Sequence, residues 1–223
     1  MERTAINSDE FLGRIKEATG WTVCLLTQQE EATIGSEGIA ASFAGVRGLL
    51  FDLGGGSCQL NWMMTGESIV MSKSPVSMPY GAAVLTNRLS REDPKKLQEE
   101  VVDAFKKAYD AIQLPNALKS RQGHHVWACG GGFRGMGYYL IAKHPIQPYP
   151  IPLINGFTVH MNTFTQAVTN QTLEMTQEEM QDMFRISKRR SAQVPAIALV
   201  IEALTLAIPN VTQIHFSQGI MLL

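Results

Sequence analysis

The chain of 223 residues has almost no excess charge of either sign, because 19 Lys and Arg stand against 20 Asp and Glu. A chain without a basic surplus has no general field to attract nucleic acid or an anionic membrane, so neither is expected as a partner. A membrane-spanning run is also lacking: the most apolar stretch, Val194 to Ile208, contains Glu202 and is shorter than the roughly 20 residues that a bilayer requires. Residues 1–4 contain no apolar signal-peptide core, so we expect a cytoplasmic protein.

Cysteine is scarce in this sequence. Cys24, Cys58 and Cys129 are odd in number and form no Cys-x-x-Cys pair, which excludes a disulfide framework and predicts buried, reduced thiols of an intracellular protein. A structural zinc site is not expected either, because the adjacent His124 and His125 have no Cys or His at ligand spacing.

Apolar residues are plentiful but divided into short segments. Hydrophobic residues make up 45% of the chain and charged residues 17%, which is enough for a folded core and excludes a disordered chain. Strand-like runs followed by helical patterns, with glycines at the crossings, predict an α/β layered fold. The expected helices are 8–20, 29–42, 82–89, 94–115, 133–143, 177–187 and 195–207, and the expected strands are 21–26, 49–53, 58–63, 68–76, 125–129, 157–161 and 214–216.

The most informative motif is the hexapeptide Asp-Leu-Gly-Gly-Gly-Ser between two of these strands, at 52–57. Consecutive glycines admit positive φ and have no Cβ to block a ligand, and successive amides of such a turn can converge on a phosphate. Asp52 is expected at the exit of a buried strand, where its carboxylate can hold Mg²⁺, and Ser57 adds a hydroxyl donor. A glycine-rich hairpin that merely turns the chain is an equally weighted alternative.

A second glycine run, at 130–132, follows a strand and opens a helix. This order places free amides and the positive end of a helix dipole at one point. The run is not a Walker A loop, since no Gly-Lys-Ser/Thr follows, and a dinucleotide fingerprint is a minor alternative because Phe133 and Arg134 would crowd a pyrophosphate. Together the two runs predict a nucleotide or polyphosphate held between strand ends.

An acidic pair and a run of three basic residues each have a functional and a structural interpretation. Glu31, next to Glu30, could orient or deprotonate an attacking water, although acids at a helix start are favoured by the dipole alone. The basic run from Lys188 to Arg190 could contact phosphate, but a solvated helix end is the favoured interpretation.

Separated motifs along nearly the whole chain resemble, in order, those of the Ppx/GppA phosphatases. They are Asn7-Ser8 with Phe11-Leu12, Glu30-Glu31-Ala32, the hexapeptide with Leu60, Ser77 to Gly81 with Leu85-Thr86, and the second glycine run. A further set resembles the fungal branch of this family that acts in retrograde, mitochondria-to-nucleus signalling: Trp127 to Gly135, His144 to Pro152, Ser187 to Arg190 and Gln193 to Ala196.

This resemblance implies an actin-like ATPase fold, in which two ribonuclease-H-like lobes enclose a phosphate-binding cleft. Residues 1–223 are then expected to be a partial domain, the end of the first lobe plus the second lobe, with the first lobe missing. Family enzymes release terminal phosphate from polyphosphate or guanosine pentaphosphate, usually with Mg²⁺. By the same resemblance the catalytic residues are Glu31, as base, and Asp52, as metal or water ligand, and the phosphate-binding residues are Gly54, Gly55, Gly56 and Ser57 with Gly130, Gly131 and Gly132.

The sequence leaves two functions open beside a third, an inactive remnant. Gln59 stands where the family pattern usually has glutamate, and a neutral amide supplies no negative charge to a metal. This favours a phosphate- or nucleotide-binding domain of a retrograde-signalling regulator that binds a partner protein according to its ligand. The alternative is a Mg²⁺-dependent phosphoanhydride hydrolase. The sequence does not decide the identity of the ligand or whether the chain forms a homodimer.

Overall fold

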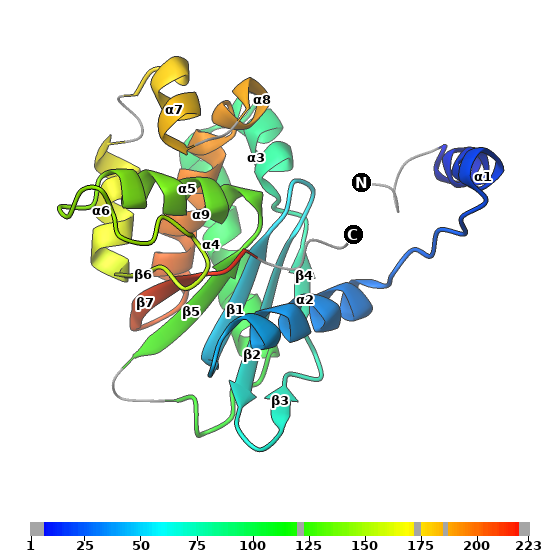
Figure 1. Ribbon diagram of the computed structural model, residues 1–223, viewed down its shortest axis with the longest axis horizontal. Coiled ribbons are helices and arrows are strands. Elements are labelled where there is room, and N and C mark those ends of the chain that lie inside the picture. Colours follow the sequence, from blue (N-terminus) through cyan, green and yellow to red (C-terminus); the bar gives the residue numbers. More distant parts are fainter. Residues whose placement is uncertain (1–6, 120–122, 172–174, 185–186, 219–223) are drawn as a thin grey trace.

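The computed structural model describes residues 7–119, 123–171, 175–184 and 187–218, which form a mixed sheet with helices against its faces (Figure 1). The strand order is β3-β2-β1-β5-β7-β6, and β4 also pairs with β2. The elements are α1 (Ser8–Thr19), α2 (Gln28–Ser42), β1 (Arg47–Leu53), β2 (Cys58–Thr65), β3 (Ile69–Met71), β4 (Val76–Met78), α3 (Ala82–Leu89), α4 (Pro94–Ala111), β5 (His124–Cys129), α5 (Gly131–Ala142), β6 (Thr158–His160), α6 (Met161–Gln171), α7 (Gln177–Phe184), α8 (Lys188–Ser191), α9 (Val194–Ala207) and β7 (Val211–Phe216).

The first glycine run joins a hairpin, as predicted. β1 and β2 are antiparallel, and their last pair before the turn is Leu53 with Cys58. β5 runs parallel to β1, and β7 runs parallel to β5. Parallel neighbours end at the same edge of a sheet, so the turn after Leu53 and the turn after Cys129 lie side by side.

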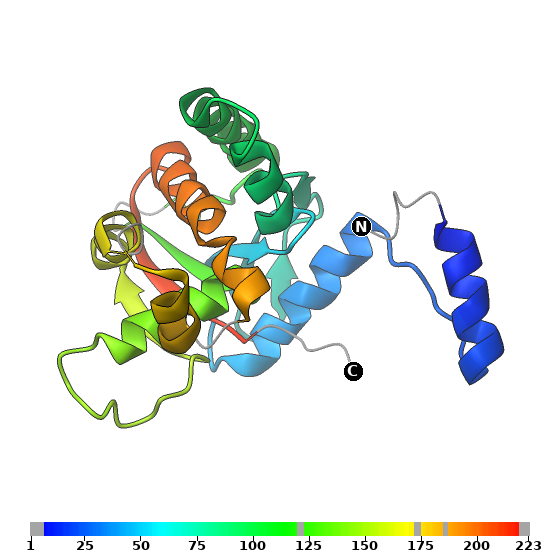
Figure 2. The same cartoon turned by 90° about the horizontal axis from the view of Figure 1, so that it is seen from above.

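The sheet separates two cores, because successive side chains of a strand point to opposite faces. Leu49, Phe51 and Leu53 of β1 are at most 1% exposed and belong to the large core that also contains α4, α5 and α9. Leu50 belongs to the smaller core beneath α2, and Asp52 faces the same side. Figure 2 shows α2 on one side of the sheet and α4 with α9 on the other. β1 is therefore central, and its last residues are held from both sides.

Helix α4 forms as its sequence pattern predicts, although it ends at Ala111 rather than close to Pro115. The Asp93 carboxylate caps its start by accepting the amides of Lys95 at 2.8 Å and Lys96 at 3.2 Å. The predicted apolar stripe is buried, with Phe105 fully enclosed. The stripe is therefore core packing rather than a ligand surface.

The expected strand at 21–26 is wrong. This segment is irregular and largely exposed, with Trp21 76% exposed and Cys24 also exposed, so only Cys58 and Cys129 fulfil the prediction of buried thiols. Helix α1 forms as expected but buries none of its residues, and it stands apart from the body in Figures 1 and 2. β-branched and aromatic residues favour a strand only where a neighbouring strand supplies the ladder and the packing, and none lies alongside this segment.

Two further expectations need correction. The strand expected at 68–76 is divided by a bend at residues 73–74 into the short β3 and β4, both paired with β2. Ser72, before the bend, still donates its amide to the Trp62 carbonyl of β2 at 3.1 Å, while its hydroxyl donates to the Ile112 carbonyl at 3.3 Å. The helix expected at 177–187 corresponds to α7 and then meets residues 185–186, which lie outside the described part of the chain.

Candidate functional site

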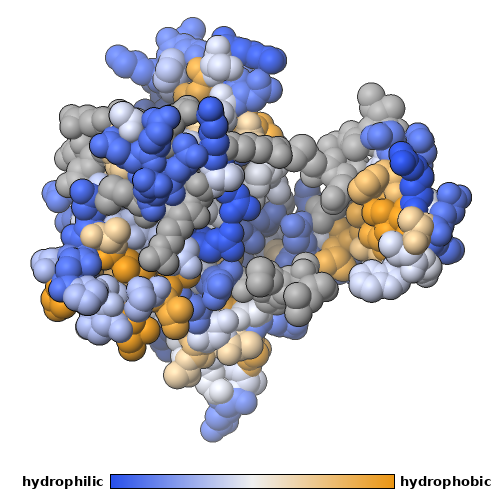
Figure 3. Space-filling model, turned by 45° about the horizontal axis from the view of Figure 1, so that its top comes forward, coloured by the Kyte–Doolittle hydropathy of each residue, from blue (hydrophilic) through white to orange (hydrophobic). Residues whose placement is uncertain are grey.

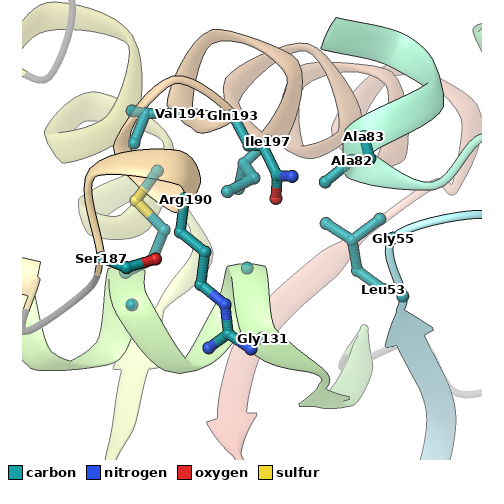
Figure 4. A pocket seen from close by; sticks show the side chains of 14 residues that line it. Leu53, Gly55, Ala82, Ala83, Gly131, Ser187, Arg190, Gln193, Val194 and Ile197 are labelled. Atoms are coloured by element: carbon teal, nitrogen blue, oxygen red, sulfur yellow. The ribbon is translucent and has the colours of Figure 1, made fainter.

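A cavity of about 360 Å³ opens at the carboxyl edge of β1 and β5. It lies between the two glycine turns on one side and the starts of α3 and α9, with α8, on the other (Figure 4). Gly54, Gly55, Gly131 and Gly132 all line it, so the two glycine runs meet at one site as the sequence predicts. Gly56, Ser57 and Gly130 belong to the same turns but do not line this cavity.

Helix α3 holds the first glycine turn in place. The turn closes on itself through the Gly54 amide, which donates to the Ser57 carbonyl at 3.0 Å. The carbonyls of Gly54 and Gly55 accept the first amides of α3, from Ala82 and Ala83, both at 2.9 Å. No described residue accepts a hydrogen bond from the amide of Gly55 or Gly56. The carbonyls of Gly54, Gly55 and Ser57 are thus occupied, while the amides of Gly55 and Gly56 remain for an anion.

The second turn requires glycine at its first position. Gly130 has φ +94° and ψ 165°, and an added Cβ would meet the Leu53 carbonyl oxygen and lie 2.7 Å from Asp52 Oδ1. This tight fit carries the chain directly from β5 into α5. The first amides of α5, at Gly131 and Gly132, have no partner within the helix and form its positive end. Such a helix start is a ready binding site for phosphate.

Arg190 is the functional residue that the sequence underrated. It lies in the short α8, yet Figure 4 shows its side chain reaching toward Gly131 at the start of α5. A Cβ on Gly131 would lie 3.6 Å from the guanidinium carbon. Arg190 is the one charged residue among the described residues that line the cavity, and no carboxylate of that part of the chain pairs with it. The sequence indicates Arg190 only as part of a basic run before an apolar helix. The spacing of that run does not show which of its three side chains points into the cavity.

Glu31 and Asp52 do not line this cavity. They meet on the α2 side of the sheet in a separate hollow of about 20 Å³, beside Gln59 and Cys129. Burial raises the pKa of Asp52, a hydrogen bond from the Cys129 thiol lowers it, and the charge of Glu31 raises it further. Burial also holds the pKa of the Cys129 thiol well above its ordinary value, so this thiol stays a donor. The structure therefore places the two acids on the opposite face of β1 from the cavity.

A hydrogen-bonded network braces α3 against α4 next to the first turn. The Tyr80 hydroxyl donates to Glu100 at 2.9 Å, and Arg88 binds both Glu100 and Glu92 at 2.7 Å. The next residue, Gly81, packs so closely on Gly55 that a Cβ would overlap its backbone. The network thereby holds in place residues 80–81, on which the first glycine turn packs.

The described residues contain no group of three or more His, Cys, Asp or Glu side chains that could hold a metal ion. Within the same residues, none of the helices combines the length and the hydropathy needed to cross a bilayer.

Comparisons with known proteins agree with this architecture. Retrograde regulation protein 2 of Saccharomyces cerevisiae is 37% identical over 227 residues, an alignment that covers 97% of this chain but only 38% of that relative. An exopolyphosphatase from Cytophaga hutchinsonii superposes with a TM-score of 0.74 at 18% identity, covering 98% of this chain and 68% of that one. The Aquifex aeolicus Ppx/GppA phosphatase superposes with a TM-score of 0.66 at 21% identity, covering 97% and 68%.

The two structural likenesses confirm the fold class, α/β with the actin-like ATPase fold. The division into the end of one lobe and a second lobe stays a prediction. A sequence model of the Ppx/GppA phosphatase family matches residues 1–221. This chain therefore belongs to the Ppx/GppA phosphatase family.

Proposed function

We propose that this chain is a phosphate- and nucleotide-binding domain of a retrograde-signalling regulator, acting in the cytoplasm through a protein partner that recognises its ligand-bound form. The observation that carries the binding proposal is the cavity at which two glycine turns, the start of α5 and Arg190 meet. The regulatory part is supported by the 37% identity to Retrograde regulation protein 2.

The lining of the cavity favours a nucleoside polyphosphate over polyphosphate. A polyphosphate chain is charged along its whole length, whereas a nucleotide joins a charged end to an apolar, flat base. The cavity matches the second description better, because amides and one guanidinium lie at one end and the remaining wall is mostly apolar, with Ser187 and Gln193 as its polar side chains. The apolar lining side chains are Leu53, Ala82, Ala83, Met136, Val194 and Ile197.

Calorimetric titration with ATP, GTP and tripolyphosphate tests this proposal. We expect Arg190→Gln to weaken binding of each probe by roughly 10- to 100-fold, because a hydrogen bond to a charged group contributes about 1.5–3 kcal/mol. The matched control is Arg91→Gln, at an exposed arginine that does not line the cavity, and it should leave affinity unchanged. Failure of the wild-type chain to bind any probe at millimolar concentration, or an equal loss in the control, contradicts the proposal.

Hydrolysis of a phosphoanhydride is the second candidate function. It is supported by the hollow shared by Glu31 and Asp52, whose volume of about 20 Å³ is enough for one water molecule. In this proposal Glu31 accepts a proton from that water as its oxygen attacks the terminal phosphorus, the bridging phosphoanhydride P–O bond breaks, and the shortened phosphate chain leaves with the bridging oxygen. The donor set also fits Mg²⁺, which is commonly held by one or two carboxylates together with substrate phosphates and waters. Asp52 would hold the ion, which when bound would neutralise phosphate charge, and Glu31 would remain the base.

Phosphate release distinguishes the two candidates. The chain would be incubated with ATP, tripolyphosphate or guanosine pentaphosphate and Mg²⁺, beside the Glu31→Gln variant. Turnover that the variant loses supports the hydrolase, whereas binding without release in either protein supports the regulator.

A further inference from the structure

Gln59 occupies an unusual place for a neutral amide. It is only 7% exposed and lies directly opposite Asp52 in the β1–β2 register, while Asp52 is opposite Cys129 on β5. The three side chains therefore form one row across the sheet, and all of them line the acidic hollow with Glu31. A carboxylate at position 59 would add a third acid to this row, whereas the amide adds none.

The Gln59 amide is directed at the first glycine turn. Its Nε2 donates a hydrogen bond to Ser57 Oγ at 3.0 Å. A serine hydroxyl has one proton and two lone pairs, so an amide that donates to the oxygen leaves the Ser57 proton for a different acceptor. No described residue takes that proton. A carboxylate in place of the amide has acceptors only, and it would take the Ser57 proton itself.

The position of Ser57 determines what the difference between an amide and a carboxylate at residue 59 means for ligand binding. Ser57 ends the turn whose Gly54 and Gly55 line the cavity, while its hydroxyl lies with Gln59 beside the acidic hollow. A polyphosphate group that extended from the cavity across this turn would be placed to meet the Ser57 hydroxyl. The Gln59 amide leaves that hydroxyl its proton, and the hollow beside it holds two acids rather than three.

We propose, building on the proposed function, that Gln59 is a positioning residue that points the Ser57 proton at the terminal phosphate. This arrangement lets the site bind a nucleoside polyphosphate without a divalent cation. A donor at the terminal phosphate supplies part of the stabilisation that a cation would otherwise provide, and the missing third carboxylate removes a source of repulsion.

The test is a double-mutant cycle of Gln59→Glu and Ser57→Ala, with ATP and tripolyphosphate as probes, in EDTA and then in Mg²⁺. In EDTA we expect Gln59→Glu to weaken binding roughly 10- to 100-fold, and Mg²⁺ to restore most of the loss. Ser57→Ala should cost about 10-fold with Gln59 present and almost nothing with glutamate there, because the glutamate already holds the proton. Simple damage to the fold would give additive losses with no dependence on Mg²⁺.

Two further variants keep the test decisive. Asn61→Asp adds a carboxylate on the same strand and face but at a residue that bonds Ser36 rather than Ser57, so it should share the repulsion that Mg²⁺ relieves and yet leave the Ser57→Ala loss at about 10-fold. Gln59→Met removes the amide without adding charge, and it should cost only a few-fold in affinity whether or not Mg²⁺ is present.

The outcomes separate this inference from the proposed function. A wild-type chain that binds neither probe overturns both. A wild-type chain that binds, with Gln59→Glu within about twofold of it or with equal Ser57→Ala losses in both backgrounds, overturns only the role of Gln59.

Discussion

Replacing Gly130 with alanine is the sharpest test of the glycine geometry at the site. The backbone there has φ +94° and ψ 165°, a region that is essentially restricted to glycine and costs other residues roughly 1–3 kcal/mol. The new Cβ would also overlap the Leu53 carbonyl oxygen and lie 2.7 Å from Asp52 Oδ1. Displacing a packed backbone to relieve such an overlap costs roughly 1–3 kcal/mol more, so the expected loss of unfolding free energy is roughly 2–6 kcal/mol.

Gly156→Ala separates the two contributions. Gly156 also has a positive φ, +88°, but an added Cβ has no atom within 4 Å, so only conformational strain of roughly 1–2 kcal/mol is expected. Both variants would be unfolded in urea at pH 7 and followed by far-UV circular dichroism. The loss at Gly130 should exceed the loss at Gly156 by at least about 1 kcal/mol, and a variant too unstable to fold at Gly130 agrees with this. Equal losses would refute the close packing of the second turn on β1.

Two other predictions concern charge and core packing. Asp52→Asn should raise the free energy of unfolding at pH 7 relative to the wild type. Folding raises the pKa of the Asp52 carboxyl, so the ionised carboxylate destabilises the folded state at pH values above the unfolded pKa near 3.8. The gain should shrink as urea titrations move from pH 7 to pH 4, and a gain that grows toward low pH contradicts the assignment. Phe51→Ala should cost roughly 3–5 kcal/mol, since Phe51 is fully buried between Phe105 and Phe133. Phe11→Ala, at a side chain 49% exposed on α1, should change the unfolding free energy by less than about 0.5 kcal/mol, and similar losses for the two would contradict the core assignment.

The local sequence is enough to predict those parts of the fold whose causes lie within a few residues. The hairpin from β1 to β2 follows from two apolar runs around three glycines. Helix α4 follows from the Asp93 cap, Pro94 and an apolar residue every three or four positions. The meeting of the two glycine turns is one step further, and it could be predicted because each run follows a buried strand and parallel strands end at one edge of a sheet.

Other features depend on contacts between distant parts of the chain, and only the tertiary structure decides them. The segment 21–26 has the composition of a strand but no strand beside it, so its propensity is not realised. The Arg190 side chain reaches the start of α5 from α8, which is distant in sequence, and no local pattern encodes that approach. Glu31 joins Asp52 rather than the cavity, since alternation along β1 sends Leu53 to one face of the sheet and Asp52 to the other.

The sequence by itself therefore determined that backbone amides would gather at the ends of two strands, because glycine runs and helix starts are local properties. The tertiary structure alone decided which side chains surround those amides. Apolar walls, the guanidinium and the pair of acids come from segments up to about 160 residues apart, and only their packing against the sheet brings them within reach of one another.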